Sequence, residues 1–309
     1  MKAFERRFRF SLRRLLPLWF CPLLGIGIAA VTGVIGAASF SALQAQEFKP
    51  FDQFLNISTR VLVGSGDNVA IAGFIVTGSD PKRVIIRAIG PSLRAAGISN
   101  TLQDPMLELH SSSGSLIASN DNWKDTQQAE IQASGLAPAD DRESAIVRTL
   151  SPGAYTAIMR GKAGASGIGL IEGYDLDSST DSIFANISTR GLVGTGDNAM
   201  IGGLIVGVNG GGVNVVIARA LGPSLSNAGV QHALQDPTLE LRDQNGVLID
   251  FNDNWKDRQE AVIERENLGP ADDRESALLD VLPAGAYTAI VRGKNDATGV
   301  ALVEFYDIR

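Results

Sequence analysis

The residues best suited to chemistry form two acidic clusters, one in each half of the chain. If the short helix-forming stretch inside a cluster loops out and returns, its five carboxylates converge and offer the hard oxygen ligands that Ca²⁺ prefers. The alternative is structural, because Asp caps helices and turns and the adjacent Arg142 can pair with neighbouring acids. Both interpretations stay open. The first cluster consists of Asp121, Asp125, Asp140, Asp141 and Glu143.

The second cluster repeats the first at a shift of 132 positions. The block NDNWKD at 120–125 returns at 252–257, and PADDRESA at 138–145 returns unchanged at 270–277. Nearly everything from residue 56 onward is two copies of one unit, with a shift of 130 near the start and two extra residues at 207–214. The second set of candidate metal ligands is Asp253, Asp257, Asp272, Asp273 and Glu275.

Each cluster contains one tryptophan, Trp123 and Trp255. An exposed indole at a loop can stack on a sugar ring or on a protein partner. An indole that packs inward instead closes the end of the hydrophobic core. The sequence allows both roles.

No residue set forms a catalytic motif, so no catalytic residue is assigned. The only histidines are His110 and His232, and the repeat aligns them with Arg242 and Asn100. A duplicated triad or histidine–zinc site is therefore not expected. A carboxylate pair could act as acid and base without histidine, which keeps a hydrolase as a third hypothesis. The only cysteine is Cys21, so the rest of the chain has no disulfide or thiolate chemistry.

The elements that must position these residues are short strands. Residues 104–110 and 236–242 alternate between apolar and polar side chains, and Gly-centred turns separate such runs. Only 126–134 and 258–267 have helix-forming composition, each followed by a capping glycine. Eight or nine strands per unit predict an all-β fold of two tandem β-sandwich or jelly-roll domains, each with one short helical insert.

The expected organisation begins with a leader at 1–45, read as a signal peptide or a membrane-anchor helix. Six basic residues occupy the first fourteen positions, and no charge occurs from 15 to 46. A connector follows at 46–55, then sandwich repeat 1 at 56–178 and sandwich repeat 2 at 179–309. The protein is expected to be exported to the periplasm, cell surface or extracellular space, or anchored in the inner membrane if the leader is retained.

The remainder of the chain is acidic, because the net charge is −7 although the leader is basic. Nucleic-acid binding needs a basic surface, so it is not expected. The expected partner is a surface polymer or a protein. Contact with a membrane is expected only through an uncleaved leader.

Three segments of each repeat resemble the bacterial pre-peptidase C-terminal (PPC) domain family. They are Asp104-Pro105 through Leu109, then 114–122, and 150–155 with Gly153-Ala154-Tyr155; the second repeat matches from Asp236-Pro237 through Tyr287. The resemblance covers about the latter 70 residues of each unit. It implies a non-catalytic β-sandwich, with calcium or polymer binding in some members. Asn122 and Asn254 replace an acidic residue of the family pattern, and no peptidase domain is present.

These observations favour a non-enzymatic exported or cell-surface tandem-repeat protein with a structural, adhesive or binding role. A calcium- or carbohydrate-binding accessory module is the alternative, and an unrecognised carboxylate hydrolase is the third hypothesis. No cofactor is required by the sequence; Ca²⁺ is the one considered.

Overall fold

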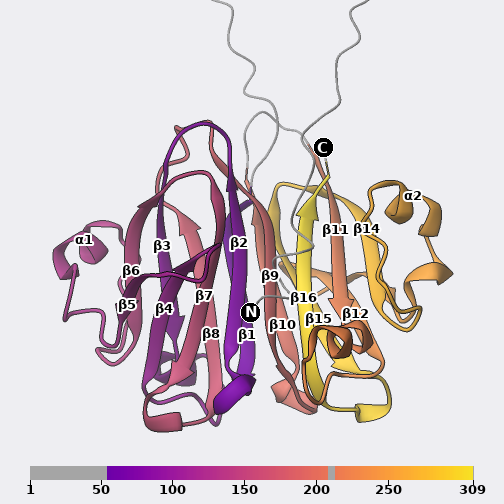
Figure 1. Cartoon of the computed structure of the whole chain (residues 1–309), viewed down its shortest axis with the longest axis horizontal. Helices are drawn as coiled ribbons and strands as arrows, with labels where there is room; N and C mark the ends of the chain where they lie inside the picture. Colours follow the sequence, from indigo (N-terminus) through magenta and orange to yellow (C-terminus); the bar gives the residue numbers. More distant parts are fainter. Residues whose placement is uncertain (1–53, 208–212, 309) are drawn as a thin grey trace, which may run out of the picture. The chain divides into compact units, whose positions relative to one another are not determined.

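The structure of the chain is a computed structural model that describes residues 54–207 and 213–308. The leader, nearly all of the connector and the glycine-rich insertion of the second repeat lie outside these residues. Within them the fold is all-β, as predicted, with eight strands from each repeat (Figure 1). No helix of the described residues is long and apolar enough to cross a membrane.

The bounds of the elements follow the repeat. The strands of the first repeat are β1 (Phe54–Val63), β2 (Ala70–Thr77), β3 (Lys82–Ile89), β4 (Pro105–Ser111), β5 (Leu116–Asn120), β6 (Ser144–Leu150), β7 (Gly153–Gly161) and β8 (Gly167–Asp175). Those of the second are β9 (Ile183–Val193), β10 (Met200–Val206), β11 (Val213–Leu221), β12 (Pro237–Asp243), β13 (Leu248–Asn252), β14 (Ser276–Pro283), β15 (Gly285–Gly293) and β16 (Gly299–Asp307).

The helices are short. The α-helices are α1 (Gln128–Ala133) and α2 (Glu260–Arg265), inside the two stretches predicted to be helical. The helix-like stretch around α1 ends at Gly135, whose φ of +72° is the left-handed conformation expected of a capping glycine. The 3-10 turns are η2 (Gly66–Asn68), η3 (Pro91–Ala96), η4 (Lys162–Gly164), η5 (Gly196–Asn198), η6 (Pro223–Ala228), η7 (Trp255–Asp257) and η8 (Lys294–Asp296).

The sixteen strands form two antiparallel rows, and each row runs through both repeats. The first row is β6-β3-β8-β1-β10-β15-β12-β13. The second row is β5-β4-β7-β2-β9-β16-β11-β14. The rows touch where β1 and β9 run parallel, with Phe54 opposite Phe184 and Leu62 opposite Leu192.

One hydrophobic core lies between the rows and contains residues of both repeats. The alternation predicted for residues 104–110 supplies part of it, because Leu107 and Leu109 of β4 are fully buried while Glu108 is half-buried. The fold is therefore β-sandwich-like. The division into two separate domains is not confirmed, because strand pairs β1–β10 and β2–β9 join the repeats within both rows.

Each helical insert covers an outer sheet face. Residues of the first insert pack on β3 and β6, where Ile131 of α1 and Trp123 contact Ile85 and Val147. The second insert covers β11 and β14 in the same way, around Trp255 and Ile263. In Figure 1, α1 and α2 lie at opposite margins of the strands.

A buried ion pair ties the first insert to the sheet. Arg87 of β3 donates two hydrogen bonds to Glu172 of β8 and a third, of 2.8 Å, to the backbone oxygen of Leu136. Its guanidinium also lies 5.1 Å from the centre of the Tyr174 ring. Burial, followed by the nearby Glu172 carboxylate, raises the pKa of the Tyr174 hydroxyl to about 12.

Candidate functional site

The acidic clusters lie where the inserts join the sheets. β5 ends at Asn120, directly before Asp121, and β6 begins at Ser144, directly after Glu143. The backbone N–H of Trp123 donates to the Glu143 carbonyl at 2.8 Å and holds the two ends of the insert together.

Glu143 is the centre of the first cluster and is fully buried. Its Oε1 accepts hydrogen bonds from the Gly90 N–H (2.9 Å), the Ser92 N–H (2.9 Å) and the Ser92 hydroxyl (2.6 Å). Its Oε2 accepts a longer bond of 3.3 Å from the Asp140 N–H. These donors belong to the turn after β3 and to the cluster itself, so the carboxylate fixes that turn against the insert.

Each of the other four carboxylates also has a partner within the protein. Hydrogen bonds from Arg142 lower the pKa of Asp140, which is the expected effect of a cation on a carboxyl group. The partners are Lys162 for Asp121 (2.7 Å), the Asn122 amide for Asp125 (2.9 Å), Arg142 for Asp140 (2.9 Å) and Lys124 for Asp141 (2.6 Å).

The second cluster has the same geometry. Glu275 is fully buried and accepts from the Gly222 N–H, the Ser224 N–H and the Ser224 hydroxyl at 2.9, 2.9 and 2.6 Å. The partners of the rest are Lys294 for Asp253 (2.5 Å), Asn254 for Asp257 (3.2 Å), Arg274 for Asp272 (2.9 Å) and Lys256 for Asp273 (2.8 Å).

The structure thus distributes the predicted metal ligands among separate ion pairs and hydrogen bonds. Across residues 54–207 and 213–308, no three His, Cys, Asp or Glu side chains are grouped as a metal site. Some polar atoms of the clusters are buried without a hydrogen-bond partner, namely the indole Nε1 atoms of Trp123 and Trp255 and Oδ1 of Asp104 and Asp121, with their counterparts in Asp236 and Asp253. Lys162 lies 3.6 Å and 2.7 Å from the other oxygens of Asp104 and Asp121.

Both tryptophans are packed inward. Trp123 is 5% exposed and Trp255 is 4% exposed, and each belongs to the small core under its insert. Stacking on a sugar needs an exposed ring face, which neither indole has. The alternative role, closing a core, is the one their burial matches.

In each repeat, the blocks NDNWKD and PADDRESA are joined by a network of hydrogen bonds between side chains and backbone. The residues of these blocks are the same in both repeats, and so are the hydrogen bonds. The Ser144 hydroxyl lies within 3.0 Å of three backbone oxygens, those of Pro105, Asn120 and Asp121. The Asn120 side chain accepts from the Ala145 N–H at 3.0 Å and donates to the Asn122 carbonyl at 2.9 Å. The second block repeats these bonds through Ser276 and Asn252.

One charged group was not singled out by the sequence. Arg258 pairs with Asp250 of β13, and Asp280 of β14 lies near both. Burial, followed by repulsion from Asp250, raises the pKa of Asp280, and its Oδ2 is buried without a partner. The first repeat has Ala118, Thr126 and Arg148 at these positions, so only a comparison of the two copies could have found it.

The histidines are separate from this group. The Nδ1 of His110 lies 3.2 Å from the carbonyl oxygen of Gly114, which accepts the hydrogen bond, and its Nε2 lies 3.0 Å from a carboxylate oxygen of Glu108. His232 has a φ of +53° and accepts from the Val300 N–H through its carbonyl. His110 thus contacts its own hairpin, whereas the backbone of His232 contacts β16.

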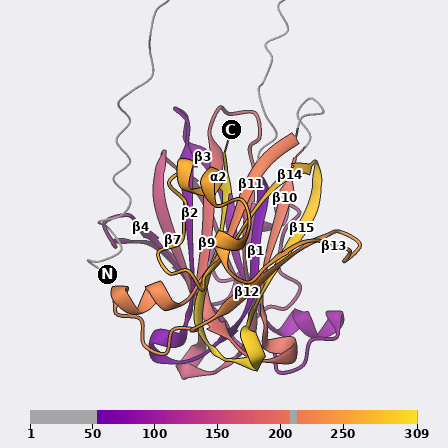
Figure 2. The same ribbon diagram turned by 90° about the vertical axis from the view of Figure 1, so that its right-hand side faces the viewer.

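An apolar strip lies at the outer edge of the second repeat. Among the described strands, β13 has a hydrogen-bonded neighbour on one side only, β12 (Figure 2). The strip comprises Val247, Leu248, Ile249 and Phe251, whose exposed fractions are 60, 48, 41 and 45%. The corresponding residues of the first repeat are Ser115, Leu116, Ile117 and Ser119, two of them polar.

Two of the four outer sheet edges are covered by glutamine side chains. On β6, the Gln127 amide accepts from the Val147 N–H (3.2 Å) and donates to its carbonyl (2.9 Å), as a neighbouring strand would. Gln259 does the same for Leu279 of β14. Side-chain cover is one way in which proteins protect sheet edges. The described residues give β5 and β13 no such glutamine, although the Phe251 N–H of β13 donates to the Asp250 carboxylate at 2.8 Å.

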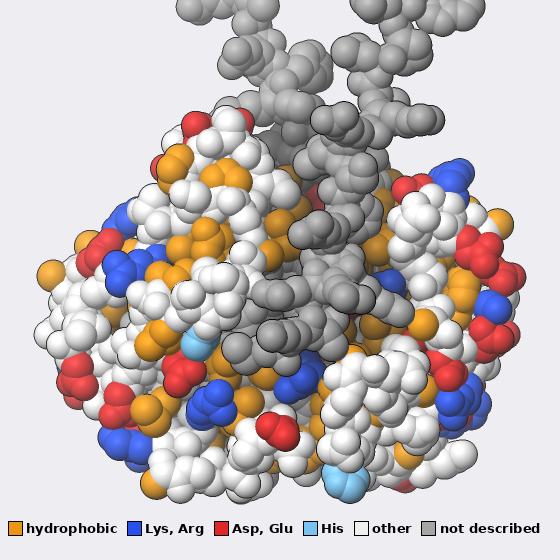
Figure 3. All heavy atoms as spheres, in the orientation of Figure 1, with side chains coloured by type: hydrophobic (Ala, Val, Ile, Leu, Met, Phe, Trp, Pro, Cys, Tyr) orange, Lys and Arg blue, Asp and Glu red, His pale blue; other side chains and the backbone are white. Residues whose placement is uncertain are grey.

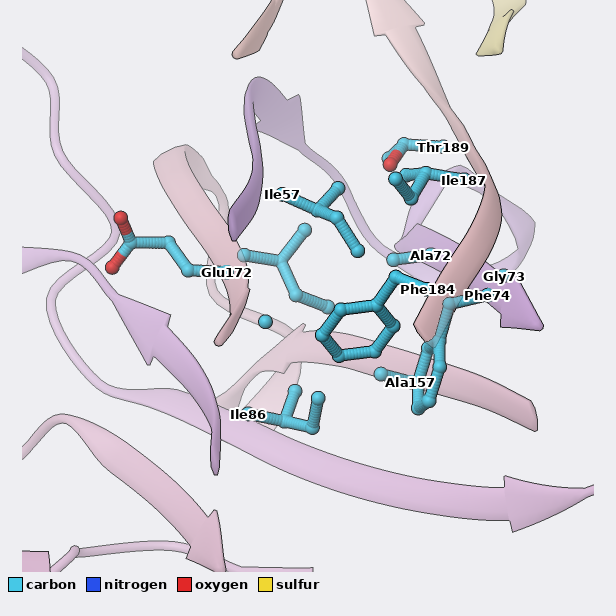
Figure 4. Close-up of a pocket in the computed structure, with 12 residues that line it drawn as sticks. Ile57, Ala72, Gly73, Phe74, Ile86, Ala157, Glu172, Phe184, Ile187 and Thr189 are labelled. Carbon is cyan, nitrogen blue, oxygen red and sulfur yellow. The ribbon is translucent and has the colours of Figure 1, made fainter. Parts of the chain in front are cut away.

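A cavity of about 20 Å³ lies in the core between strands of the first repeat and β9 of the second (Figure 4). Ile57, Ile86 and Phe184 line it, and the Glu172 carboxylate points away from it. It is beside Gly173, where the second repeat has Phe305. This volume accommodates about one water molecule and is far below that of a substrate pocket.

The fold and the clusters define a β-sandwich-like protein of two joined repeats, with charges of both signs interspersed over the face seen in Figure 3. No family model matches the chain, and no curated protein matches it. The resemblance to PPC domains therefore stays a prediction.

Among solved structures, the chain is similar to a DUF4785 family protein of Legionella pneumophila, at 10% identity over 83% of this chain and 84% of that one. The TM-score is 0.22, so this similarity carries no argument about function.

Proposed function

We propose that the chain is a non-enzymatic, exported tandem-repeat protein with a binding role, and that the apolar strip at β13 binds an extended segment of a partner protein. The strip carries the proposal, because contiguous exposed apolar surface beside an open sheet edge is typical of strand addition. The first repeat supplies the contrast, since it has Ser115 and Ser119 in the places of Val247 and Phe251.

The choice of an extended peptide follows from how this fold uses its other edges. The inner edges β1 and β2 are completed by antiparallel strands of the other repeat, and β6 and β14 are capped by glutamine amides. An added strand would give β13 the same antiparallel pairing. Its apolar side chains would contact the strip, whereas backbone hydrogen bonds would supply affinity.

A peptide selection tests this binding role. Phage-displayed random peptides are selected on the intact chain, and the binders are tested against the double variant Val247→Ser, Phe251→Ser, which installs the residues of the first repeat. Peptides with alternating apolar residues are expected, with binding at least tenfold weaker to the double variant. Leu116→Ser in the first repeat is the matched control and should leave binding unchanged. Selection of no peptide, or equal binding to the double variant, contradicts the proposal.

Export is the second part of the proposal and rests on the leader. Its basic start and long uncharged stretch support secretion, with cleavage after Ala45 or retention as an anchor. Fractionation of the producing cell, with mass determination of the N-terminus, distinguishes a cleaved form from an anchored form. A full-length chain in the cytoplasm contradicts both.

Calcium binding is the second candidate function, and the unpartnered Oδ1 atoms of Asp104 and Asp121 favour it. Bound Ca²⁺ would satisfy these buried oxygens, although Lys162 competes for the same carboxylates. Calorimetric titration of the intact chain with Ca²⁺ tests it directly. Heat of binding that disappears in Asp104→Asn with Asp236→Asn supports the site, whereas no heat at millimolar Ca²⁺ removes it.

A further inference from the structure

The two repeats join about a pseudo-twofold axis. Arg60 of β1 is opposite Ile201 of β10, and Arg190 of β9 is opposite Ile71 of β2. These two pairs are equivalent by the shift of 130. The contact between the repeats, called the joint below, therefore resembles the interface of a symmetric homodimer, although both halves belong to one chain.

Residues at the axis meet their own counterparts. The hydroxyls of Thr59 and Thr189 are 2.8 Å apart, and both side chains are almost fully buried. Identical residues are compatible with this contact because one hydroxyl donates and the other accepts. Such a position would suit two identical repeats equally well.

The next inward-facing position breaks the symmetry. Val61 of β1 is 1% exposed, and its counterpart in β9 is Gly191. A β-carbon at Gly191 would overlap the Val61 Cγ2 and would lie 3.4 Å from Val61 Cβ and 3.5 Å from Met200 Cε. The valine side chain therefore occupies the space that the glycine leaves.

A second size difference lies toward the other end of β9. Phe74 of β2 packs edge-to-face on Phe184 of β9, with ring centres 5.6 Å apart. The counterpart of Phe74 is Leu204, whereas Phe184 corresponds to the equally aromatic Phe54. The two halves of the joint thus hold different sets of side chains.

We infer that the joint is a heterotypic interface: the inner edge of repeat 1 fits the inner edge of repeat 2, and neither fits a second copy of itself. Two copies of repeat 1 would place Val61 against Val61 in a space that has no room for a β-carbon. Two copies of repeat 2 would place Gly191 against Gly191 and leave a void. The partner for which this surface is built is the other type of repeat.

A double-mutant cycle in the intact chain tests the inference. Gly191→Val overpacks the joint and Val61→Gly empties it, so each should lower the melting temperature by about 3–8 °C. The swap Val61→Gly with Gly191→Val moves the valine to the other side of the axis and keeps the composition. It should recover most of the loss. A swap as unstable as the two single changes combined overturns the inference.

Partner choice is measured on the same chain after a protease site is inserted between Thr180 and Asp181. The cut protein is unfolded in guanidinium, refolded by dilution and weighed by native mass spectrometry. A complex of residues 1–180 with residues 181–309 is expected, with little of either self-pair. Equal amounts of self-pairs and mixed pairs overturn the inference. If the pieces do not refold, the cycle in the intact chain decides the question alone.

Discussion

Removal of the Glu143 carboxylate should destabilise the chain more than any change at the exposed members of its cluster. Glu143→Ala leaves the Gly90 and Ser92 N–H groups and the Ser92 hydroxyl without an acceptor. Each unsatisfied buried group costs about 1–3 kcal/mol, and removing a buried charge returns part of that cost. The net loss in free energy of unfolding should be about 3–5 kcal/mol.

Urea unfolding with linear extrapolation measures this loss. Glu143→Gln keeps one acceptor oxygen and should lose about 1–2 kcal/mol. Glu275→Ala removes the same set of bonds from the second repeat, so its loss should match that of Glu143→Ala. Glu130→Ala is the control, because its pair with Arg83 is about 40% exposed and should be worth about 0.5 kcal/mol. The reasoning is refuted if Glu143→Ala costs less than about 1 kcal/mol, or no more than the control.

Asp280→Asn should raise the free energy of unfolding at pH 7 by about 0.5–1 kcal/mol, since the raised pKa of Asp280 marks a carboxylate that is destabilised by burial; the gain is small because solvent screens this half-exposed side chain. Thermal melts should show the gain fading as the pH falls through the raised pKa of the folded chain, and absent below about pH 4, the ordinary pKa of Asp. The pKa of Tyr174 is raised to about 12, so folding stabilises its neutral form. This contribution to stability is complete below about pH 10 and is lost as the pH rises toward 12. The pKa is measured from the tyrosinate absorbance of the folded chain, compared with that of Tyr174→Phe. Gly173→Phe alone should lower the free energy of unfolding by about 1–3 kcal/mol through overpacking. Gly173→Phe with Ile86→Ala copies the pair Phe305 and Ala218 of the second repeat and should lower it by about 1 kcal/mol or less. Urea unfolding measures both losses.

The sequence predicted the strands well because their signal is local. The alternation at 104–110 and the turn glycines place β4 and its neighbours, and the glycine at 135 ends the helix-like stretch of the first insert. These patterns depend on residues close together in the chain, which is why they can be read without coordinates.

The sequence offered the local pair of the acidic cluster, Arg142 with Asp140, as one alternative, but it could not supply the partners that are distant in sequence. Lys162 reaches Asp121 across 41 positions, and Glu143 binds Gly90 across 53. From sequence alone, such carboxylates are equally consistent with a metal site. The burial of the tryptophans depends in the same way on the sheet face that each insert covers.

The continuity of the sheets through both repeats was also missed. Pairing at a sheet edge leaves no mark on the period-two pattern, because β1 would alternate in the same way with or without β10 beside it. A signal was nevertheless present in the duplicate sequences. Val61 and Gly191 occupy the same aligned position but differ in size. Such a difference is needed where the two copies pack against each other, because the valine fills the space that the glycine leaves.

Hydrogen exchange of the intact chain, followed by mass spectrometry of peptides, tests the joining of the repeats most directly. Residues 56–60 of β1 and 186–190 of β9 have a strand on each side in the structure, so their amides should exchange as slowly as those of the interior strand β7. If the repeats were separate bodies, both segments would be sheet edges. Exchange as fast as that of the edge strands β5 and β13 would contradict the joined sheets.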